Sequence, residues 1–193
     1  MPGQRAIDGE PLLALRAGNP APFEAFVREH SATLIAYFRQ NGRALARAED
    51  LAQEVFVHLY RAARRYEPRE RFAAYCFRVA RNVLVDDARR AGRQLAASGL
   101  DERELSGPET EPGAGLLRSE SDERVGELLA RLPRSQREVV ELAILGELDY
   151  AEIASLLAIP VGTVKSRMFY ALRALRSLAP RSALALVAER RWA

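Results

Sequence analysis

The chain has 193 residues, of which 48% are hydrophobic, enough to bury one medium core or two small ones. Its formal net charge of +3 excludes a protein that coats nucleic acid by bulk charge, so any DNA contact must come from local clusters. A single cysteine, Cys76, excludes an internal disulfide and a cysteine-based zinc site. Because no run approaches the ~20 apolar residues of a membrane span, and the N-terminus lacks an apolar signal core, we expect a cytoplasmic protein without membrane insertion.

Helical periodicity predicts an all-α fold of two small domains. The first domain covers residues 10–93, with breaks at 18–22, 41–42 and 67–68. Residues 94–124 are acidic and rich in turn residues, and such a segment cannot bury enough apolar surface to fold alone. We therefore predict a flexible linker there, followed by a second helical domain over 125–178 and a tail over 179–193.

Residues 48–60 are expected to form a helix with two different faces. The apolar side chains expected in the core are Leu51, Ala52, Val55 and Leu59. The opposite face carries an acidic and amide-bearing stripe, made of Asp50, Gln53, Glu54 and Val57. This stripe suits the docking of a partner, although a solvated helix face would have the same pattern.

The next expected helix, residues 72–90, carries a basic face. Its core side is expected to contain Phe72, Cys76, Val79 and Val83. The opposite side carries Arg78, Arg81, Asn82, Val85 and Arg89, and the aromatic residues nearby are Tyr66, Tyr75 and Phe77. Arginines beside an amide and aromatic rings can bind a phosphate backbone and hold an unstacked base. An ion-paired surface helix remains the alternative, because Asp86 and Asp87 lower the local charge.

Residues 148–175 indicate two helices joined by a tight turn. In the first helix the apolar residues are Ile153, Ala154, Leu156 and Leu157, and the helix is expected to end near 158–159. We expect Pro160 to open the second helix, with Gly162 and Thr163 supplying turn freedom and a capping hydroxyl. The core face of the second helix is expected to be Val164, Met168, Ala171, Leu172 and Leu175.

The outer face of this second helix suits a DNA groove. It is expected to carry Thr163, Lys165, Ser166, Arg167, Tyr170 and Arg173. Guanidinium groups can bind guanine edges or phosphate oxygens, and short hydroxyls allow close approach to the backbone. The segment therefore predicts a helix-turn-helix, with an ordinary helical hairpin as the alternative.

Four segments resemble the characteristic regions of extracytoplasmic-function sigma factors of bacterial RNA polymerase. They are residues 49–56 (EDLAQEVF), 72–86 (FAAYCFRVARNVLVD), 132–139 (LPRSQREV) and 160–167 (PVGTVKSR), and they occur in the family's order. The resemblance implies a non-enzymatic initiation factor without a cofactor. Its partners would be the polymerase core, through the beta-prime clamp helices and the beta flap, promoter DNA, and an anti-sigma factor.

The resemblance also implies roles for individual residues. It places Asp50, Gln53 and Glu54 on the polymerase clamp helices. The second helix of the helix-turn-helix would read the −35 element with the outer-face residues named above. For the −10 element, the loop 66–71 and the following helix would receive a base flipped from the non-template strand, which implicates Tyr66, Arg69, Arg71, Arg78, Arg81, Asn82 and Arg89.

Two positions depart from the family pattern. Tyr75 stands where relatives usually have Trp, which keeps an aromatic ring, and Tyr170 stands where Arg is common. The second change removes a guanidinium from the reading face, so a relative's promoter sequence cannot be transferred. Two other classes stay open: a DNA-binding repressor with a helical sensor domain, and a helical enzyme, for which the two distant histidines give no metal-like spacing.

Overall fold

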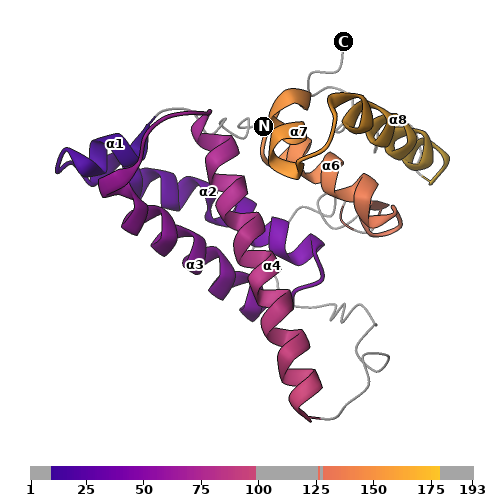
Figure 1. Ribbon diagram of the computed structural model, residues 1–193, viewed down its shortest axis with the longest axis horizontal. Coiled ribbons are helices and arrows are strands. Elements are labelled where there is room, and N and C mark those ends of the chain that lie inside the picture. The colour runs from indigo at the N-terminus through magenta and orange to yellow at the C-terminus, as the bar shows by residue number, and fades with distance from the viewer. Residues whose placement is uncertain (1–9, 99–125, 127, 179–193) are drawn as a thin grey trace. The chain divides into compact units, whose positions relative to one another are not determined.

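The computed structural model describes residues 10–98, 126 and 128–178, and all regular structure in these ranges is helical. The chain divides into two compact units, of which one contains helices α1 to α4 and the other α6 to α8 (Figure 1). The predicted all-α class with two helical domains is confirmed.

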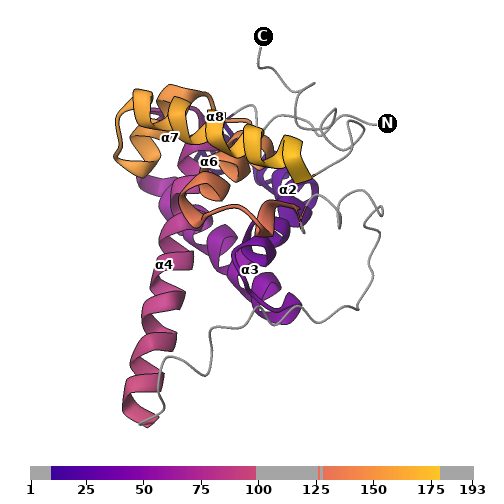
Figure 2. The same ribbon diagram turned by 90° about the vertical axis from the view of Figure 1, so that its right-hand side faces the viewer.

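The first unit is built on three long helices. Its elements are α1 (Pro11–Arg16), α2 (Ala21–Gln40), α3 (Leu45–Ala62), the short 3-10 helix η1 (Ala63–Arg65) and α4 (Phe72–Ser98). Helix α3 packs between α2 and α4, and α1 packs against α2 and η1. The C-terminal turns of α4 extend away from α2 and α3 (Figures 1 and 2).

Aromatic rings join α2 to the other helices in the core of this unit. The Phe26 ring lies 5.0 Å from that of Phe72 on α4 and 5.8 Å from that of Phe56 on α3, both edge-on. Tyr37 meets Phe77 on α4 in the same way, with 5.5 Å between ring centroids. Edge-to-face pairs of this kind add about 0.5–1.5 kcal/mol each beyond the area they bury. The core therefore fixes α4 against α2 as well as α3.

The expected core faces of α3 and α4 are largely confirmed. The following expected core residues are buried: Leu51, Ala52, Val55, Leu59, Phe72, Cys76 and Val83. Val79 is only half-buried. Burial raises the pKa of the Cys76 thiol to about 12, so this cysteine stays protonated and serves as a small core side chain.

Helix α4 is longer than the sequence pattern predicted. It continues to Ser98, so residues 94–98, which we had expected in the linker, are helical. The reason is that helix elongation costs far less than nucleation, and Gln94, Leu95 and Ala96 are good helix formers. The remainder of the expected linker, 99–124, and the tail, 179–193, lie outside the described residues.

The second unit contains, among its described residues, three helices shorter than α2 and α4. They are α6 (Arg134–Leu145), α7 (Tyr150–Leu157) and α8 (Val161–Leu178), and each packs against the other two. Of the core residues expected in α7 and α8, those that are buried are Ile153, Ala154, Val164, Met168, Ala171 and Leu175. Leu156, Leu157 and Leu172 are half-buried.

The turn between α7 and α8 differs from the expected one. Ala158 adopts the left-handed conformation, with φ of 53°, and closes α7 where the sequence placed its end. Helix α8 begins at Val161, and the Pro160 carbonyl accepts hydrogen bonds from the N–H groups of Thr163 (2.9 Å) and Val164 (3.2 Å). Gly162 and Thr163 therefore lie inside the first helical turn and do not form the connection. The chain leaves the direction of α7 at the left-handed Ala158, so a glycine at position 162 is not needed for the turn.

A capping box that the sequence analysis missed starts α7. One Asp149 carboxylate oxygen accepts from the N–H groups of Ala151 and Glu152, each at 2.8 Å. In return, the Glu152 carboxylate accepts from the Asp149 N–H at 2.8 Å. This exchange satisfies N–H groups that have no partner within the helix.

We expect Asp149→Ala to destabilise α7 by about 1 kcal/mol, because it leaves these N–H groups without their acceptor. The amide hydrogens of α7 should then exchange about fivefold faster in the full-length protein. Hydrogen exchange followed by mass spectrometry measures this change. Asp149→Ser, which keeps an acceptor, is the control, and equal acceleration by both substitutions would contradict the capping role.

Candidate nucleic-acid interface

Helix α8 presents a polar face opposite its buried one. Lys165, Ser166, Tyr170 and Arg173 are exposed, whereas Thr163 and Arg167 are half-buried at the edge of that face. The Ser166 hydroxyl donates to the Thr163 carbonyl at 3.0 Å. The structure therefore gathers the six expected groove-facing residues on one side of a single helix. Its cations and hydroxyls suit phosphate oxygens and base edges.

Phe169 is a residue of this face that the sequence analysis missed. Its ring is 62% exposed and lies 5.5 Å from that of Tyr170, nearly edge-on. The signal was available, because Lys165, Phe169 and Arg173 follow the i, i+4, i+8 spacing that keeps residues on one helix face. An exposed aromatic pair adds apolar contact area to the polar surface.

Helix α4 and the loop before it present a second basic surface. The expected residues that are exposed there are Arg69, Arg71, Arg78, Asn82 and Arg89, and Arg81 is half-buried. Several of these arginines already have acidic partners. Arg69 lies 2.7 Å from Glu67, and Arg89 lies 3.5 Å from Asp86. Exposed pairs of this kind contribute about 0–1 kcal/mol, so nucleic acid can displace the acidic partners.

Arg78 contacts both an acidic and an aromatic side chain. Its guanidinium lies 2.6 Å from the Glu70 carboxylate and 5.2 Å from the centre of the Tyr75 ring. The contact to Glu70 joins the loop to α4, and the contact to Tyr75 is a cation–π interaction. Burial raises the pKa of the half-buried Tyr75. Glu70 is thus a residue of this surface that the sequence pattern did not single out.

Two of the three aromatic rings expected to be available to a base are instead buried. Tyr66 packs its ring 5.0 Å from that of Tyr75, and its carbonyl accepts a hydrogen bond from Arg16 at 3.0 Å. Phe77 is fully buried against Tyr37. The expectation for Phe77 is wrong, because α4 buries an arc wide enough to include it. Tyr75 is the ring of the three that keeps exposed surface.

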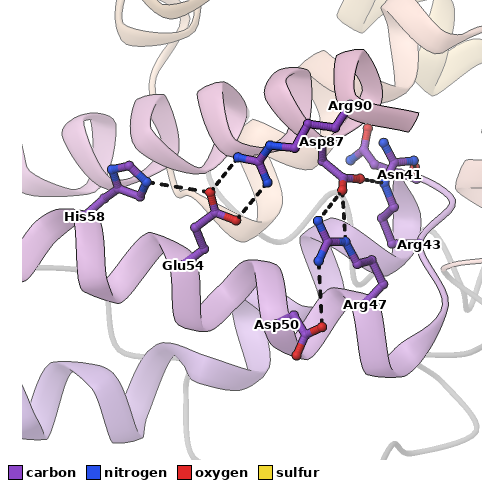
Figure 3. Close-up of polar contacts among 8 residues, drawn as sticks. All are labelled: Asn41, Arg43, Arg47, Asp50, Glu54, His58, Asp87 and Arg90. Atoms are coloured by element: carbon purple, nitrogen blue, oxygen red, sulfur yellow. Dashed lines mark hydrogen bonds and ion pairs between the residues drawn. The ribbon is translucent and has the colours of Figure 1, made fainter. Parts of the chain in front are cut away.

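The stripe on α3 lies at the surface, as expected. Asp50, Gln53 and Val57 are exposed, and Glu54 is half-buried. Figure 3 shows Glu54 beside Arg90 of α4 and His58 of its own helix. The hydrogen bond from Arg90 holds the pKa of the Glu54 carboxyl below its usual value, so this side chain is ionised at neutral pH.

Comparison with known proteins finds the same two units. Residues 26–94 match the family model for sigma-70 region 2, and residues 122–186 match that for sigma-70 region 4. The ECF RNA polymerase sigma factor RpoE of Cereibacter sphaeroides is 31% identical over 159 residues, which cover 81% of this chain and 85% of the relative. SigL of Mycobacterium tuberculosis, another ECF sigma factor, is 35% identical over 165 residues, covering 83% and 90%.

The chain belongs to the ECF sigma factors. It is a sigma factor of RNA polymerase and not an enzyme, with a region 2 that handles −10 recognition and melting and a region 4 that binds the −35 element. The alternatives of a repressor and of a helical enzyme are thereby set aside. Helices α2 to α4 of this sigma factor lie mainly in region 2, and α6 to α8 lie in region 4.

Solved structures show the same fold. CnrH, determined in complex with the cytosolic domain of CnrY, aligns with a TM-score of 0.60 and 24% identity over 86% of this sigma factor and 94% of CnrH. RpoE of Bartonella quintana, determined with the anti-sigma factor NepR, aligns with a TM-score of 0.63 and 22% identity over 79% and 90%. Within the described part of the chain, no helix has the length and apolar character to cross a membrane.

Proposed function

We propose that this sigma factor docks on the clamp helices of the polymerase beta-prime subunit through Asp50, Gln53 and Glu54. The proposal is supported by the position of these side chains on one accessible stripe of α3, opposite the buried Val55 and Leu59. Ionised carboxylates suit basic groups on the polymerase, and the amide of Gln53 can both donate and accept hydrogen bonds.

The −35 element is assigned to the outer face of α8. Thr163, Lys165, Ser166, Arg167, Tyr170 and Arg173 form the proposed reading surface, and Phe169 extends it. The guanidinium groups of Arg167 and Arg173 can distinguish guanine from the other bases, whereas Lys165 and the hydroxyl groups suit the phosphates. The aromatic side chains Phe169 and Tyr170 offer apolar contact to the methyl group of thymine.

The −10 element is assigned to the loop 66–71 and the exposed side of α4. Arg69, Arg71, Arg78, Arg81 and Arg89 would hold the backbone of the non-template strand, and Asn82 would bind the extruded base. Tyr66 packs against Tyr75 in this arrangement and does not itself stack on DNA, since its ring is buried. Strand opening costs a few kcal/mol for each unstacked step, and binding of the extruded base offsets part of that cost.

The remaining partners follow from the polymerase partnership. We propose that region 4 also contacts the beta flap, and that the protein works in the cytoplasm, where the polymerase transcribes. CnrH and the RpoE of Bartonella quintana were each solved with a bound protein, CnrY and the anti-sigma factor NepR respectively. On that basis we propose that an anti-sigma factor also binds this chain.

One observation carries these assignments: the exposed polar face of α8, which includes Lys165, Tyr170 and Arg173, lies opposite a face buried through Val164, Met168 and Leu175. A helix with this division keeps its reading residues available while its apolar side holds the unit together. Asn82 has the same standing on α4, where it is exposed on the side opposite the buried Ala73 and Leu84.

Run-off transcription with the purified polymerase core tests the division of labour. We expect Arg167→Ala to weaken recognition of the −35 element by about 1–3 kcal/mol if its guanidinium contacts a base edge. Asn82→Ala should instead reduce strand opening, measured by permanganate reactivity, more than it reduces formation of the closed complex.

Arg134→Ala, which removes an exposed arginine from α6, is the control for the loss of charge in region 4. Equal losses of closed-complex formation and opening in the Arg167 and Asn82 variants would contradict separate roles. Failure of the unaltered protein to direct the core to any promoter would reject the wider assignment.

A further inference from the structure

The docking stripe on α3 is tied to α4 by ion pairs that no sequence pattern predicted (Figure 3). The two guanidinium nitrogens of Arg90 face the two carboxylate oxygens of Glu54, at 2.9 and 3.5 Å. His58 adds a third nitrogen 3.7 Å from Glu54. Arg90 is 36 residues from Glu54 in sequence, so this fork-to-fork pair joins the two helices.

A second cluster fixes the same two helices one turn earlier on α4. The buried Asp87 carboxylate accepts from Arg43 at 2.5 Å and from Arg47 at 2.9 and 2.6 Å. Arg47 also lies 3.7 Å from Asp50 on the docking stripe. Figure 3 shows Asp87 between the two arginines, on the same side of α4 as Arg90.

The Asp87 cluster adds to the core packing that aligns α3 with α4. Burial raises the pKa of the Asp87 carboxyl, but the hydrogen bonds from Arg47 and Arg43 outweigh burial and hold the pKa below its usual value. A buried carboxylate with several charge-assisted hydrogen bonds is strongly held in one geometry. Because Arg90 follows Asp87 by one helical turn, this alignment brings its guanidinium to Glu54.

Pairing with Arg90 leaves Glu54 able to bind a partner. A carboxylate has about four lone-pair positions, and the contacts with Arg90 and His58 do not fill them. The Glu54 side chain remains 28% exposed. A side chain that is already held in position loses less conformational entropy when a partner binds.

We propose that Arg90 is a positioning residue for polymerase binding, which holds the Glu54 carboxylate in the orientation that docks. This inference rests on the proposed docking role of Glu54. It means that α4, which carries Asn82 for the −10 element, also orders the polymerase-binding face of α3. The two activities of region 2 then share one rigid helix pair.

A double-mutant cycle on the full-length protein tests the proposal. The affinity for the polymerase core is measured for the unaltered protein, Glu54→Gln, Arg90→Gln and the double variant. We expect Arg90→Gln to weaken binding roughly five- to tenfold when Glu54 is present, and to have no further effect when position 54 is Gln. Thermal unfolding of each variant separates loss of affinity from loss of fold.

The matched control is Arg93→Gln, which removes an exposed arginine one turn further along α4 and should leave the affinity unchanged. Arg90→Lys should recover part of the loss, because lysine keeps the charge without the planar fork. If Arg90 had a purely structural role, the affinity recovered by Arg90→Lys would not depend on whether residue 54 is Glu.

The other outcomes overturn the proposal in distinguishable ways. If Arg90→Gln lowers polymerase affinity equally with Glu and with Gln at position 54, Arg90 contacts the polymerase directly. If Arg90→Gln binds more tightly than the unaltered protein, the ion pair with Arg90 competes with the polymerase for Glu54. Unchanged affinity of Arg90→Gln alone rejects the positioning role. Unchanged affinity of Glu54→Gln would reject the docking role of Glu54 as well.

Discussion

Phe77→Ala is expected to lower the free energy of unfolding of region 2 by about 3–5 kcal/mol. The Phe77 side chain is fully buried and packs edge-on against Tyr37, so its removal leaves a cavity between α2 and α4. The surrounding helices can collapse only partly, because the Asp87 cluster and the Phe26–Phe72 pair hold them in place. Urea unfolding followed by circular dichroism measures the change.

The chain offers a chemically identical control for this loss. Phe169→Ala removes the same side chain from the exposed face of α8, where it leaves no cavity. We expect this variant to change the free energy of unfolding by no more than an ordinary surface substitution does, about ±0.5 kcal/mol. A loss below 1 kcal/mol for Phe77→Ala would contradict the place of this ring in the core.

The second large effect is expected at the docking stripe, where Glu54→Lys should reduce polymerase affinity by about 2–5 kcal/mol. The substitution removes the proposed docking carboxylate and places a cation beside Arg90 and His58. The new ammonium group and the Arg90 guanidinium repel each other, and the surface around position 54 changes from acidic to basic. Equilibrium binding of the labelled protein to the polymerase core measures the loss.

Glu24→Lys is the charge-matched control, because it makes the same change at an exposed position on α2. We expect it to bind the core as the unaltered protein does. If both variants lose affinity equally, the effect is one of net charge. If Glu54→Lys binds normally, Glu54 does not lie in the interface.

Patterns of apolar residues were sufficient to predict the helices. The stripe of Leu51, Val55 and Leu59 in α3 and that of Val164, Met168 and Leu175 in α8 are buried as the spacing predicted. These patterns work because a helix in a small domain buries one side, and its period of 3.6 residues is visible in the sequence. The exposed residues of α8 and α4 then followed by elimination.

The same patterns failed where a helix contacts more than one partner. Phe77 lies next to Cys76 in α4, and a sequence stripe does not show how wide the buried arc is. The arc includes Phe77 because rings of α2 reach α4 in addition to the packing of α3. The turn role expected of Gly162 and Thr163 was wrong for another reason: the chain turns at Ala158, whose left-handed conformation is rare for alanine and gives no sequence signal.

The sequence by itself determined the all-helical class, the two units and most of the polar residues that α4 and α8 expose, because these depend on local periodicity and on motifs in a fixed order. Only the tertiary structure decided the partners of individual charges. From the sequence, Asp86 and Asp87 were interpreted alike as charges that lower the basic character of the helix, yet Asp86 is exposed beside Arg89, whereas Asp87 is buried between Arg43 and Arg47. Likewise, the pairing of Glu54 with Arg90 depends on how α3 lies against α4, and contacts between residues far apart in sequence are set by packing.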